Sequence, residues 1–340
     1  TSGLATLHGS DVKTRDAYAR MDVAGYNYGI NRYKKDFRLY PDRVIVGSET
    51  FCADAYRFWE LAKQNPALIG DFVWSGMDYL GECGIGAWDY KDYAPEFDHG
   101  VGWLTAGAGR LDLTGKPTGE AAYTQVAFEL SPIRIGVVPA DHAGEPHSPS
   151  AWRMTNTYES WAWNGCEGKK TQVEVYARGA KVALFLNGEK LGEKVPKKDC
   201  RVVFQVEYRP GVLSAVSYDD EGKELCRTSL QSAQGDTQLT LLPERNEVGP
   251  EDLCYVRLQY TDQDGMVKPL VRGEIHVSVT GGTLCGLGNA CPYNETGYLT
   301  HTTDTYYGEA LAIIKPDSPG TVQISAESRY GTAQAQITCR

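Results

Sequence analysis

The stretch VIVGSET, residues 44–50, decides how the first part of this chain is read. A run of small and β-branched residues is typical of a buried strand, and here it passes directly into Ser48 and Glu49. A glutamate in this place has two interpretations. It is either a nucleophile at the rim of a parallel α/β barrel, or a residue in the first turn of the next helix, where its charge complements the helix dipole.

Strand and helix signals alternate around this stretch. Strands are predicted at 21–26, 43–47 and 68–74, and helices are predicted between them and at 118–130. Nearly continuous apolar strands separated by helices predict a parallel sheet that is covered on its faces. A doubly wound open sheet is the alternative, but no G-x-G-x-x-G phosphate loop follows any of these strands.

The pattern changes after Leu130. Residues 131–170 contain four prolines and little periodicity, which indicates a linker. From Thr171 onward the chain consists of short strand signals bounded by turn residues, and Asn187-Gly188 marks a hairpin. This spacing predicts two β-sandwiches, one in 131–235 after the linker and an Ig-like one in 236–340. The strands are predicted at 171–177, 181–187, 201–208, 212–218, 223–230, 237–242, 253–261, 274–280, 309–315, 321–328 and 333–339.

Composition narrows the class of partner. The formal net charge is −10, which argues against nucleic acid and against an anionic membrane surface, since both attract clustered Lys and Arg. No apolar run approaches the roughly 20 residues that cross a bilayer, and the first sixteen residues lack the basic start and apolar centre of a signal peptide.

The nine cysteines form no C-x-x-C pair, which favours free buried thiols. Three histidines lie in polar loops without the spacing of metal ligands: His99, His142 and His147. We expect neither a metal nor an organic cofactor.

Polar and aromatic residues follow the three predicted strands of the first part. In a parallel barrel the functional side chains gather at the carboxyl ends of the strands. Trp faces stack on the apolar face of a sugar ring while carboxylates and amides bind its hydroxyls, so this set indicates a carbohydrate site. Glu49 is the candidate nucleophile, and a tyrosine hydroxyl donating to it would stabilise its charged form. The candidate substrate-binding residues are Tyr26, Asn27, Tyr28, Trp74 and Asp78, with Glu82 also near the third strand end.

Two segments carry a resemblance to a known family. DVAGYNYGINRYKKDFRLYPDRVIVGSET (22–50) and IGDFVWSGMDYLGECGIG (69–86) resemble the last third of the catalytic barrel of glycoside hydrolase family 2, closest to its bacterial β-galactosidase-like branch. The resemblance implies that residues 1–130 are barrel strands six to eight of a (β/α)8 barrel and that the mechanism is retaining. It further implies that Glu49 is the nucleophile at strand seven and Trp74 the strand-eight residue that contacts the sugar. Tyr28, or alternatively Tyr26, matches the tyrosine that hydrogen-bonds the nucleophile. Residues 173–193, 239–269 and 285–298 are similar to the sandwich domains that follow the barrel.

The family's general acid/base has no counterpart here. In the family it is a glutamate in an Asn-Glu pair after barrel strand four, before the nucleophile, but the 48 residues before Glu49 contain no glutamate. Asn246-Glu247 and Asn294-Glu295 occur only in the sandwich region. We therefore expect a C-terminal fragment that carries the nucleophile, lacks the acid/base and is inactive by itself. Three strands cannot close a barrel, so this part either borrows surface from the sandwiches, pairs with a second copy in a homo-oligomer, or is partly disordered.

Two other functions compete with the hydrolase. Tandem sandwiches also suit a non-catalytic carbohydrate-binding or adhesion module, in which Trp161 and Trp163 would form a stacking platform; burial of both in a core is favoured, because tryptophans are highly buried on average. Residues 171–340 could also serve only to brace the barrel. For the hydrolase, a β-galactoside is the expected substrate, with β-glucuronide and β-mannoside open, and a periplasmic or secreted location is inferred from the family.

Overall fold

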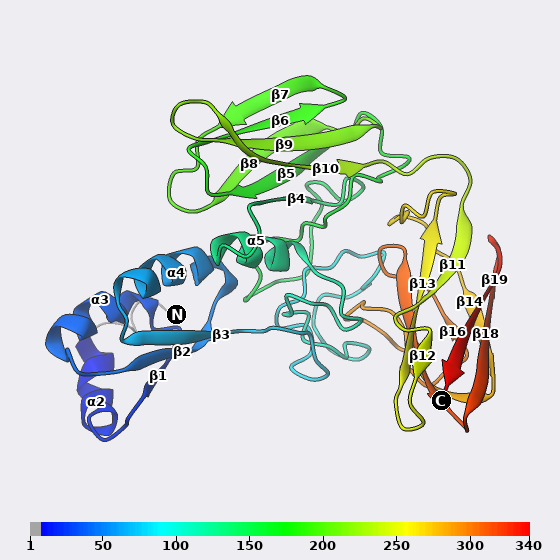
Figure 1. Ribbon diagram of the computed structural model, residues 1–340, viewed down its shortest axis with the longest axis horizontal. Coiled ribbons are helices and arrows are strands. Elements are labelled where there is room, and N and C mark those ends of the chain that lie inside the picture. The colour runs from blue at the N-terminus through cyan, green and yellow to red at the C-terminus, as the bar shows by residue number, and fades with distance from the viewer. Residues whose placement is uncertain (1–7) are drawn as a thin grey trace.

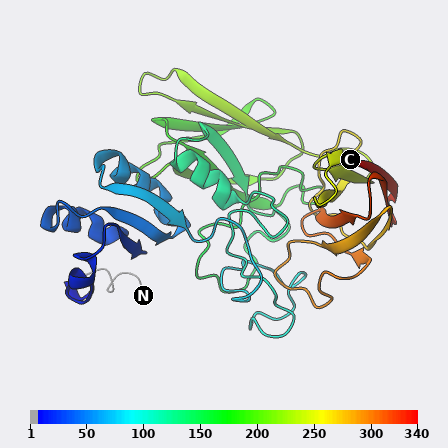
Figure 2. The ribbon, with the colours of Figure 1, turned by 60° about the horizontal axis from the view of Figure 1, so that its bottom comes forward.

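The computed structural model describes residues 8–340. Residues 1–7 lie outside the described residues. They begin the predicted first domain, 1–130, and the first sixteen residues, in which no signal peptide was predicted. Figure 1 shows an α/β unit at one end, a β-sandwich above the centre and a second sandwich at the other end, joined by a loop-rich region. Figure 2 shows the same order from another side, with helix α5 between the α/β unit and the first sandwich.

The α/β unit contains the predicted parallel sheet. Its three strands run in the order β1-β2-β3, with Ala24 beside Ile45 and Ile45 beside Leu68, so the parallel arrangement is confirmed. The elements are α2 (His8–Tyr18), β1 (Ala24–Asn27), α3 (Ile30–Leu39), β2 (Ile45–Thr50), the short helix η1 (Cys52–Asp54), α4 (Ala55–Gln64) and β3 (Leu68–Val73). Apolar side chains of the strands and of α3 and α4 form one buried cluster between sheet and helices. Helix α2 was not predicted from the sequence.

Glu49 lies inside strand β2, which ends at Thr50. The next α-helix, α4, begins only at Ala55, after η1. The interpretation of Glu49 as a first-turn helical residue is therefore wrong. Its backbone belongs to the ladder of the parallel sheet, which fixes where its side chain starts.

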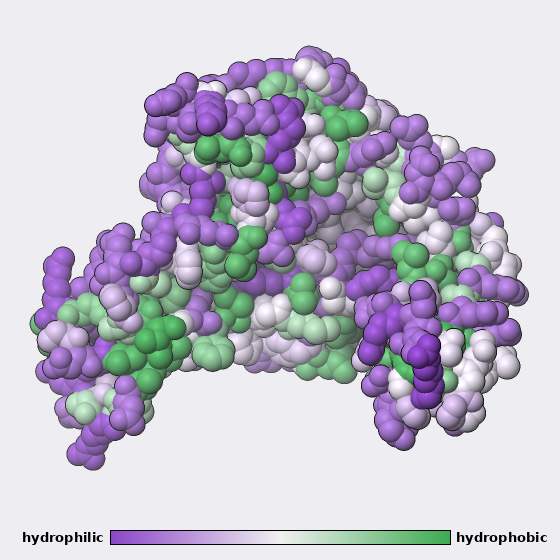
Figure 3. All heavy atoms as spheres, in the orientation of Figure 1, coloured by the Kyte–Doolittle hydropathy of each residue, from purple (hydrophilic) through white to green (hydrophobic). Residues whose placement is uncertain are grey.

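The open α/β unit packs against the first sandwich through helix α5 (Gly119–Ala127). Cys52 and Ala55 share a buried cluster with Tyr123 of α5 and with Tyr176 and Cys200 of the sandwich. The unit thus borrows surface from a sandwich, which is one of the three solutions that the sequence left open. Apolar side chains nevertheless remain exposed on the sheet, where Figure 3 shows hydrophobic surface: Val23, Ile69 and Phe72 are 41, 57 and 67% exposed.

The first sandwich pairs sheet β4-β5-β8 with sheet β10-β9-β6-β7. Its strands are β4 (Ile133–Val137), β5 (Lys170–Ala177), β6 (Lys181–Leu186), β7 (Glu189–Lys194), β8 (Arg201–Glu207), β9 (Val212–Tyr218) and β10 (Glu224–Gln231). Strand β4 corrects the prediction that 131–170 is only a linker. Trp161 and Trp163 are fully buried in the core between the sheets, so the stacking platform is excluded and the prediction of core burial is confirmed.

The second sandwich pairs sheet β11-β13-β17-β15 with sheet β12-β19-β18-β14-β16 around its own core. Its strands are β11 (Gln238–Pro243), β12 (Glu247–Val248), β13 (Cys254–Thr261), β14 (Ile275–Thr280), β15 (Gly282–Gly288), β16 (Thr302–Thr303), β17 (Glu309–Pro316), β18 (Gly320–Ser328) and β19 (Gly331–Cys339). The eleven strands predicted after Thr171 are all present, within two residues at each end. Strands β12, β15 and β16 of this sandwich and β7 of the first were not predicted.

Six of the nine cysteines are buried, and all nine are free thiols. Among residues 8–340, no group of His, Cys, Asp and Glu side chains is arranged to hold a metal ion. No helix in the same range combines the length and the apolar character that crossing a membrane requires.

Candidate active site at the end of the parallel sheet

The ends of the three parallel strands meet at Glu49. Asn27, the last residue of β1, is paired with Glu49 in the sheet register, and the Tyr28 backbone N–H donates to the Glu49 carbonyl oxygen at 2.6 Å. On the other side, the Trp74 backbone N–H donates to the carbonyl oxygen of Thr50 at 3.0 Å. Because parallel strands end at one edge of a sheet, residues far apart in the sequence are held together here.

Tyr28 is the side chain most closely tied to Glu49. Its backbone takes the left-handed conformation, with φ of 52°. Burial and then a hydrogen bond to the Glu49 carboxylate raise the pKa of the Tyr28 hydroxyl, so the phenol stays protonated at neutral pH. The Tyr28 hydroxyl is thus a hydrogen-bond donor beside the Glu49 carboxylate.

Aromatic rings surround this pair. The Tyr28 ring lies 4.3 Å from the ring of Phe51 and 5.3 Å from that of Trp152, measured between centroids. The rings of Phe51 and Trp152 are themselves stacked at 5.1 Å. These three rings form an aromatic cluster that packs on the Tyr28 side chain.

Trp74 meets a second tyrosine on the loop that follows β3. The rings of Trp74 and Tyr79 lie 5.8 Å apart at 81°, and the Tyr79 hydroxyl donates to the carboxylate of Glu82. Burial, followed by this hydrogen bond, raises the pKa of Tyr79, and the nearby charge of Glu49 adds to the effect. Glu49 therefore shares its surroundings with two phenols, an indole and a second carboxylate.

Tyr26 is not part of this group, which corrects its prediction as a substrate-binding residue. It is 2% exposed, its hydroxyl donates to Asp36 at 2.6 Å and accepts from Arg43 at 2.9 Å, and its ring stacks on Tyr18. The residues of a strand alternate between faces, so Tyr26 enters the core while its neighbours do not. Its hydroxyl is engaged with Asp36 and Arg43, which leaves Tyr28 as the tyrosine beside Glu49.

Asn27 and Asp78 have different surroundings. Asn27 is exposed, and its side-chain oxygen accepts a hydrogen bond from the Ser48 hydroxyl at 2.7 Å, next to Glu49 in the sheet. Asp78 is 7% exposed, accepts from the Ala108 backbone N–H at 3.2 Å and lines a small cavity with Arg153 and Tyr306. The Asp78 carboxylate is thus used at least in part to hold the loop at Ala108.

Sequence reasoning missed Phe51, Tyr79 and Trp152 as members of the group. Phe51 lies two residues after Glu49 and Tyr79 directly follows Asp78, so their proximity could have been inferred. Trp152 lies in the stretch predicted as a linker, more than 100 residues after Tyr28, and no local pattern connects the two. Only the packing of the sandwich region against the α/β unit brings it here.

Known proteins match most of the chain. The family described as "Glycoside hydrolase family 2 C-terminal domain 5" matches residues 238–338, and a domain of unknown function matches residues 168–226. A β-galactosidase of Bacteroides ovatus is 24% identical over 284 residues, which are 82% of this chain and 29% of that protein. A putative β-glucuronidase of Formosa agariphila is 27% identical over 237 residues, 68% of this chain and 20% of that protein.

A solved structure of a family 2 glycosyl hydrolase from Bacteroides cellulosilyticus is also similar. Its TM-score is 0.85 at 31% identity, over 98% of this chain and 44% of that chain. The present chain thus spans less than half the length of each of these relatives.

Proposed function

Because this chain corresponds to a C-terminal portion of a glycoside hydrolase family 2 enzyme, we propose that it supplies the nucleophile of a retaining β-glycosidase, with Glu49 in that role. The observation that carries the proposal is the meeting of Glu49, Tyr28 and Trp74 at adjacent ends of three parallel strands. In this proposal β1, β2 and β3 are strands six, seven and eight of a (β/α)8 barrel.

The geometry suggests a role for each side chain. The Glu49 carboxylate would attack the anomeric carbon and form a covalent glycosyl ester, while an acid on the other side of the bond protonates the departing oxygen. Water then cleaves the ester, and the configuration of the sugar is retained. The Tyr28 hydroxyl would orient Glu49 before attack, and the Trp74 ring would offer an apolar face to the sugar.

The acid/base is proposed to lie outside this chain. In retaining enzymes the two carboxyl groups are about 5–5.5 Å apart. No glutamate precedes Glu49 in the chain, and Glu247 lies in strand β12 of the second sandwich, where it pairs with Arg340. Since proton transfer to the leaving group is worth roughly 10²–10⁴-fold in rate, we expect little activity from the chain alone.

The surroundings of Glu49 favour a neutral sugar, and a β-galactoside is the proposed substrate. The side chains gathered with Glu49 are aromatic or acidic: Tyr28, Phe51, Trp74, Tyr79, Glu82 and Trp152. A glucuronide carboxylate would be repelled by Glu82 and would find no cation among these six. The alternative of a sandwich-based binding module loses its stacking platform, because Trp161 and Trp163 are buried.

Covalent labelling tests the proposal directly. A 2-deoxy-2-fluoro aryl β-galactoside would be reacted with a version of the protein extended at its amino end, and the labelled peptide identified by mass spectrometry. We expect the label on Glu49, and release of nitrophenol from an aryl β-galactoside only by the extended version. Glu49→Gln should lower that activity by several orders of magnitude, while Glu247→Gln on the exposed β12 edge should not.

Two results would overturn parts of this assignment. A label on another carboxylate would remove Glu49 from its role. Activity of the 340-residue chain that disappears in Glu49→Gln would show that the acid lies within it.

A further inference from the structure

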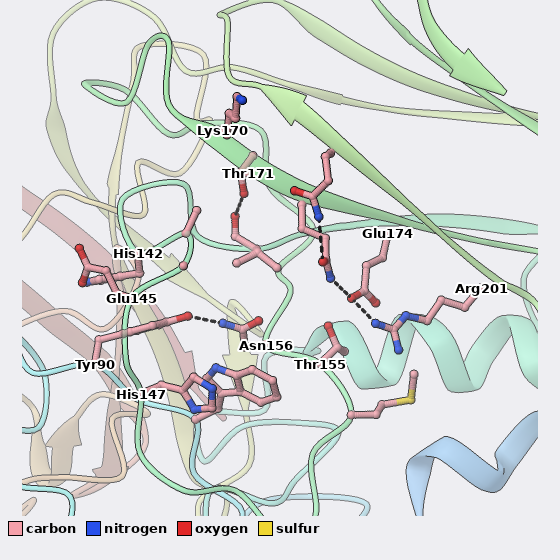
Figure 4. A pocket seen from close by; sticks show the side chains of 17 residues that line it. Tyr90, His142, Glu145, His147, Thr155, Asn156, Lys170, Thr171, Glu174 and Arg201 are labelled. Atoms are coloured by element: carbon pink, nitrogen blue, oxygen red, sulfur yellow. Dashed lines mark hydrogen bonds and ion pairs between the residues drawn. The ribbon is translucent and has the colours of Figure 1, made fainter. Parts of the chain in front are cut away.

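A second site lies away from Glu49, between the loop region and the first sandwich. It is a cavity of about 530 Å³, within the range of about 300–1,000 Å³ that is usual for small-molecule sites. Three parts of the chain line it: the loop at 88–90, the segment 138–156, and strands β5 and β8 (Figure 4). None of the residues gathered around Glu49 is among its lining residues.

One wall of the cavity is aromatic. The rings of Trp88 and His147 are stacked with centroids 4.1 Å apart, and those of Tyr90 and His142 are stacked at the same distance. Asn156 donates its amide N–H to the Tyr90 hydroxyl, as Figure 4 shows. The indole N–H of Trp88 is buried and makes no hydrogen bond of normal geometry among the described residues, and the Tyr90 hydroxyl is a polar group beside it. The Trp88 indole and the Tyr90 hydroxyl thus add polar groups to this aromatic wall.

The opposite wall is polar and held in place. Glu174 is fully buried on β5 and accepts hydrogen bonds from Arg201 at 2.8 Å, Gln172 at 2.8 Å and Tyr176 at 2.9 Å. Gln205 on β8 in turn donates to Gln172 at 3.2 Å. Such a network presents amide and guanidinium groups in fixed positions, so a ligand would not have to order them.

The permanent charges of the lining residues are two positive and two negative: Lys170 and Arg201 against Glu145 and Glu174. His142 also lines the cavity, and its pKa is raised because its hydrogen bond to Asp92 and the charge of Asp141 outweigh the effect of burial. Stacked rings on one side and oriented amide groups on the other match a molecule with apolar C–H faces and many hydroxyls. A neutral sugar has this chemistry, whereas a phosphate or a nucleotide would require a net positive lining.

We propose that this cavity is an accessory site for a short neutral oligosaccharide. This proposal does not depend on the role of Glu49. Strands β5 and β8, which line the cavity, lie in the segment that matches a domain of unknown function, and the proposal assigns a binding function to their shared face. The two sites are neighbours along the chain. Trp152 packs on Tyr28, whereas Thr155 and Asn156 line the cavity.

Ligand-detected NMR and titration with lactose, cellobiose and maltose would test the proposal on the whole chain. Ala143→Leu adds bulk inside the cavity without adding a hydrogen-bonding group, and Gln205→Leu removes an amide at nearly constant size. We expect the chain to bind at least one of these disaccharides, and each variant to weaken binding about tenfold or more. Ser318→Leu, in an exposed turn of the second sandwich, is the matched control and should bind normally.

Three outcomes would overturn the proposal. One is the absence of binding to the unaltered chain at millimolar disaccharide. Another is binding that survives both cavity variants but is lost in Trp74→Ala, which would place the sugar beside Glu49. The third is tighter binding of a disaccharide that contains glucuronate, which would contradict a neutral ligand. Unchanged melting temperatures of the two cavity variants exclude misfolding as the cause of a loss.

Discussion

At the scale of single residues, Tyr28 is the side chain tied most closely to Glu49. The Tyr28 hydroxyl is kept protonated by burial and by its hydrogen bond to Glu49. The ring of Tyr28 is in turn held between Phe51 and Trp152. A change to Tyr28 therefore tests the proposed role of Glu49 without altering the carboxylate itself.

We predict that Tyr28→Phe, in the version of the protein extended at its amino end, lowers kcat about 10²-fold, as loss of one well-placed donor typically does. KM for an aryl β-galactoside should change little, because the lost hydrogen bond is to Glu49 and not to the sugar. Steady-state kinetics measure both constants. Tyr56→Phe, on α4, is the control. An unchanged kcat in Tyr28→Phe would argue against Tyr28 as the partner of Glu49.

Asp71, on β3 beside Gly47, predicts a dependence of stability on pH. Burial raises the pKa of Asp71 to about 6, although a hydrogen bond donated by Thr50 opposes the effect. The folded state therefore binds a proton more tightly than the unfolded state. The contribution of Asp71 is favourable below pH 4 and is lost as the pH rises through 6.

Asp71→Asn should remove this loss, because an amide does not ionise. We expect the variant to gain up to about 3 kcal/mol relative to the unaltered chain between pH 4 and pH 7. Chemical denaturation at several pH values measures the difference. Asp42→Asn, at an exposed position before β2, should show no such trend. A variant that loses stability on going to pH 7 would show that the Asp71 carboxylate is charged in the folded protein.

At the scale of elements, two of the strands missed from the sequence, β7 and β15, depart from the usual apolar alternation. Strand β7 is an edge strand of sequence EKLGEK, and charged residues at an edge oppose pairing with another chain. Strand β15 contains three glycines, which resemble turn residues in the sequence. In the structure a Cβ on Gly288 would approach the Tyr298 ring to 2.4 Å, so glycine is required by that close approach. Strand β4 alternates normally but lies between Pro132 and Pro139, within the stretch predicted as a linker.

The core of the second sandwich predicts a large difference between two leucines. Leu258 on β13 is fully buried, whereas Leu242 on β11 is 50% exposed. We expect Leu258→Ala to lower the free energy of unfolding by about 2–5 kcal/mol, because it leaves a cavity. Leu242→Ala should cost less than about 1 kcal/mol. Thermal or urea denaturation of the two variants decides this, and equal losses would contradict the assigned register of β11 and β13.

At the scale of the whole molecule, the loop region after β3 joins the α/β unit to the second sandwich. The Tyr306 hydroxyl donates to the buried carboxylate of Asp89 at 2.6 Å. The Arg272 guanidinium donates to the Asp92 carbonyl oxygen at 2.9 Å and lies over the ring of Tyr93, 4.5 Å from its centroid. These contacts connect residues about 200 positions apart in the sequence, and they position the loop that carries Tyr79 and Glu82.

Tyr306→Phe should weaken this connection, because it removes the donor from a buried carboxylate. Burial raises the pKa of Asp89 to about 6. The lost hydrogen bond should therefore cost about 1–3 kcal/mol at pH 7, where the group is ionised, and less at pH 5. Melting temperatures at both pH values provide the measurement. Tyr255→Phe, on the partly exposed face of β13, should be nearly neutral at both. A loss that is larger at pH 5 would contradict the role assigned to Asp89.

Local sequence patterns were sufficient for much of this protein. Periodicity predicts the parallel strands, their intervening helices and eleven later strands. The motifs place Tyr28, Glu49 and Trp74 at or after the ends of the three parallel strands. These features depend on residues close in sequence, whose spacing determines which face of a strand or helix is apolar. The sequence also identified the burial of Trp161 and Trp163 as the favoured outcome, since large indoles seek a core.

The tertiary structure decided what depends on contacts between distant segments. It placed Glu49 in a strand rather than a helix, sent Tyr26 into the core with Asp36, and brought Trp152 onto Tyr28 from a stretch without periodicity. It also formed the cavity between the loop at Trp88 and strand β5. The physical reason is that these neighbours are determined by side-chain packing between elements far apart in the sequence. The periodicity of a short segment predicts its own buried face but not which distant segment packs on that face.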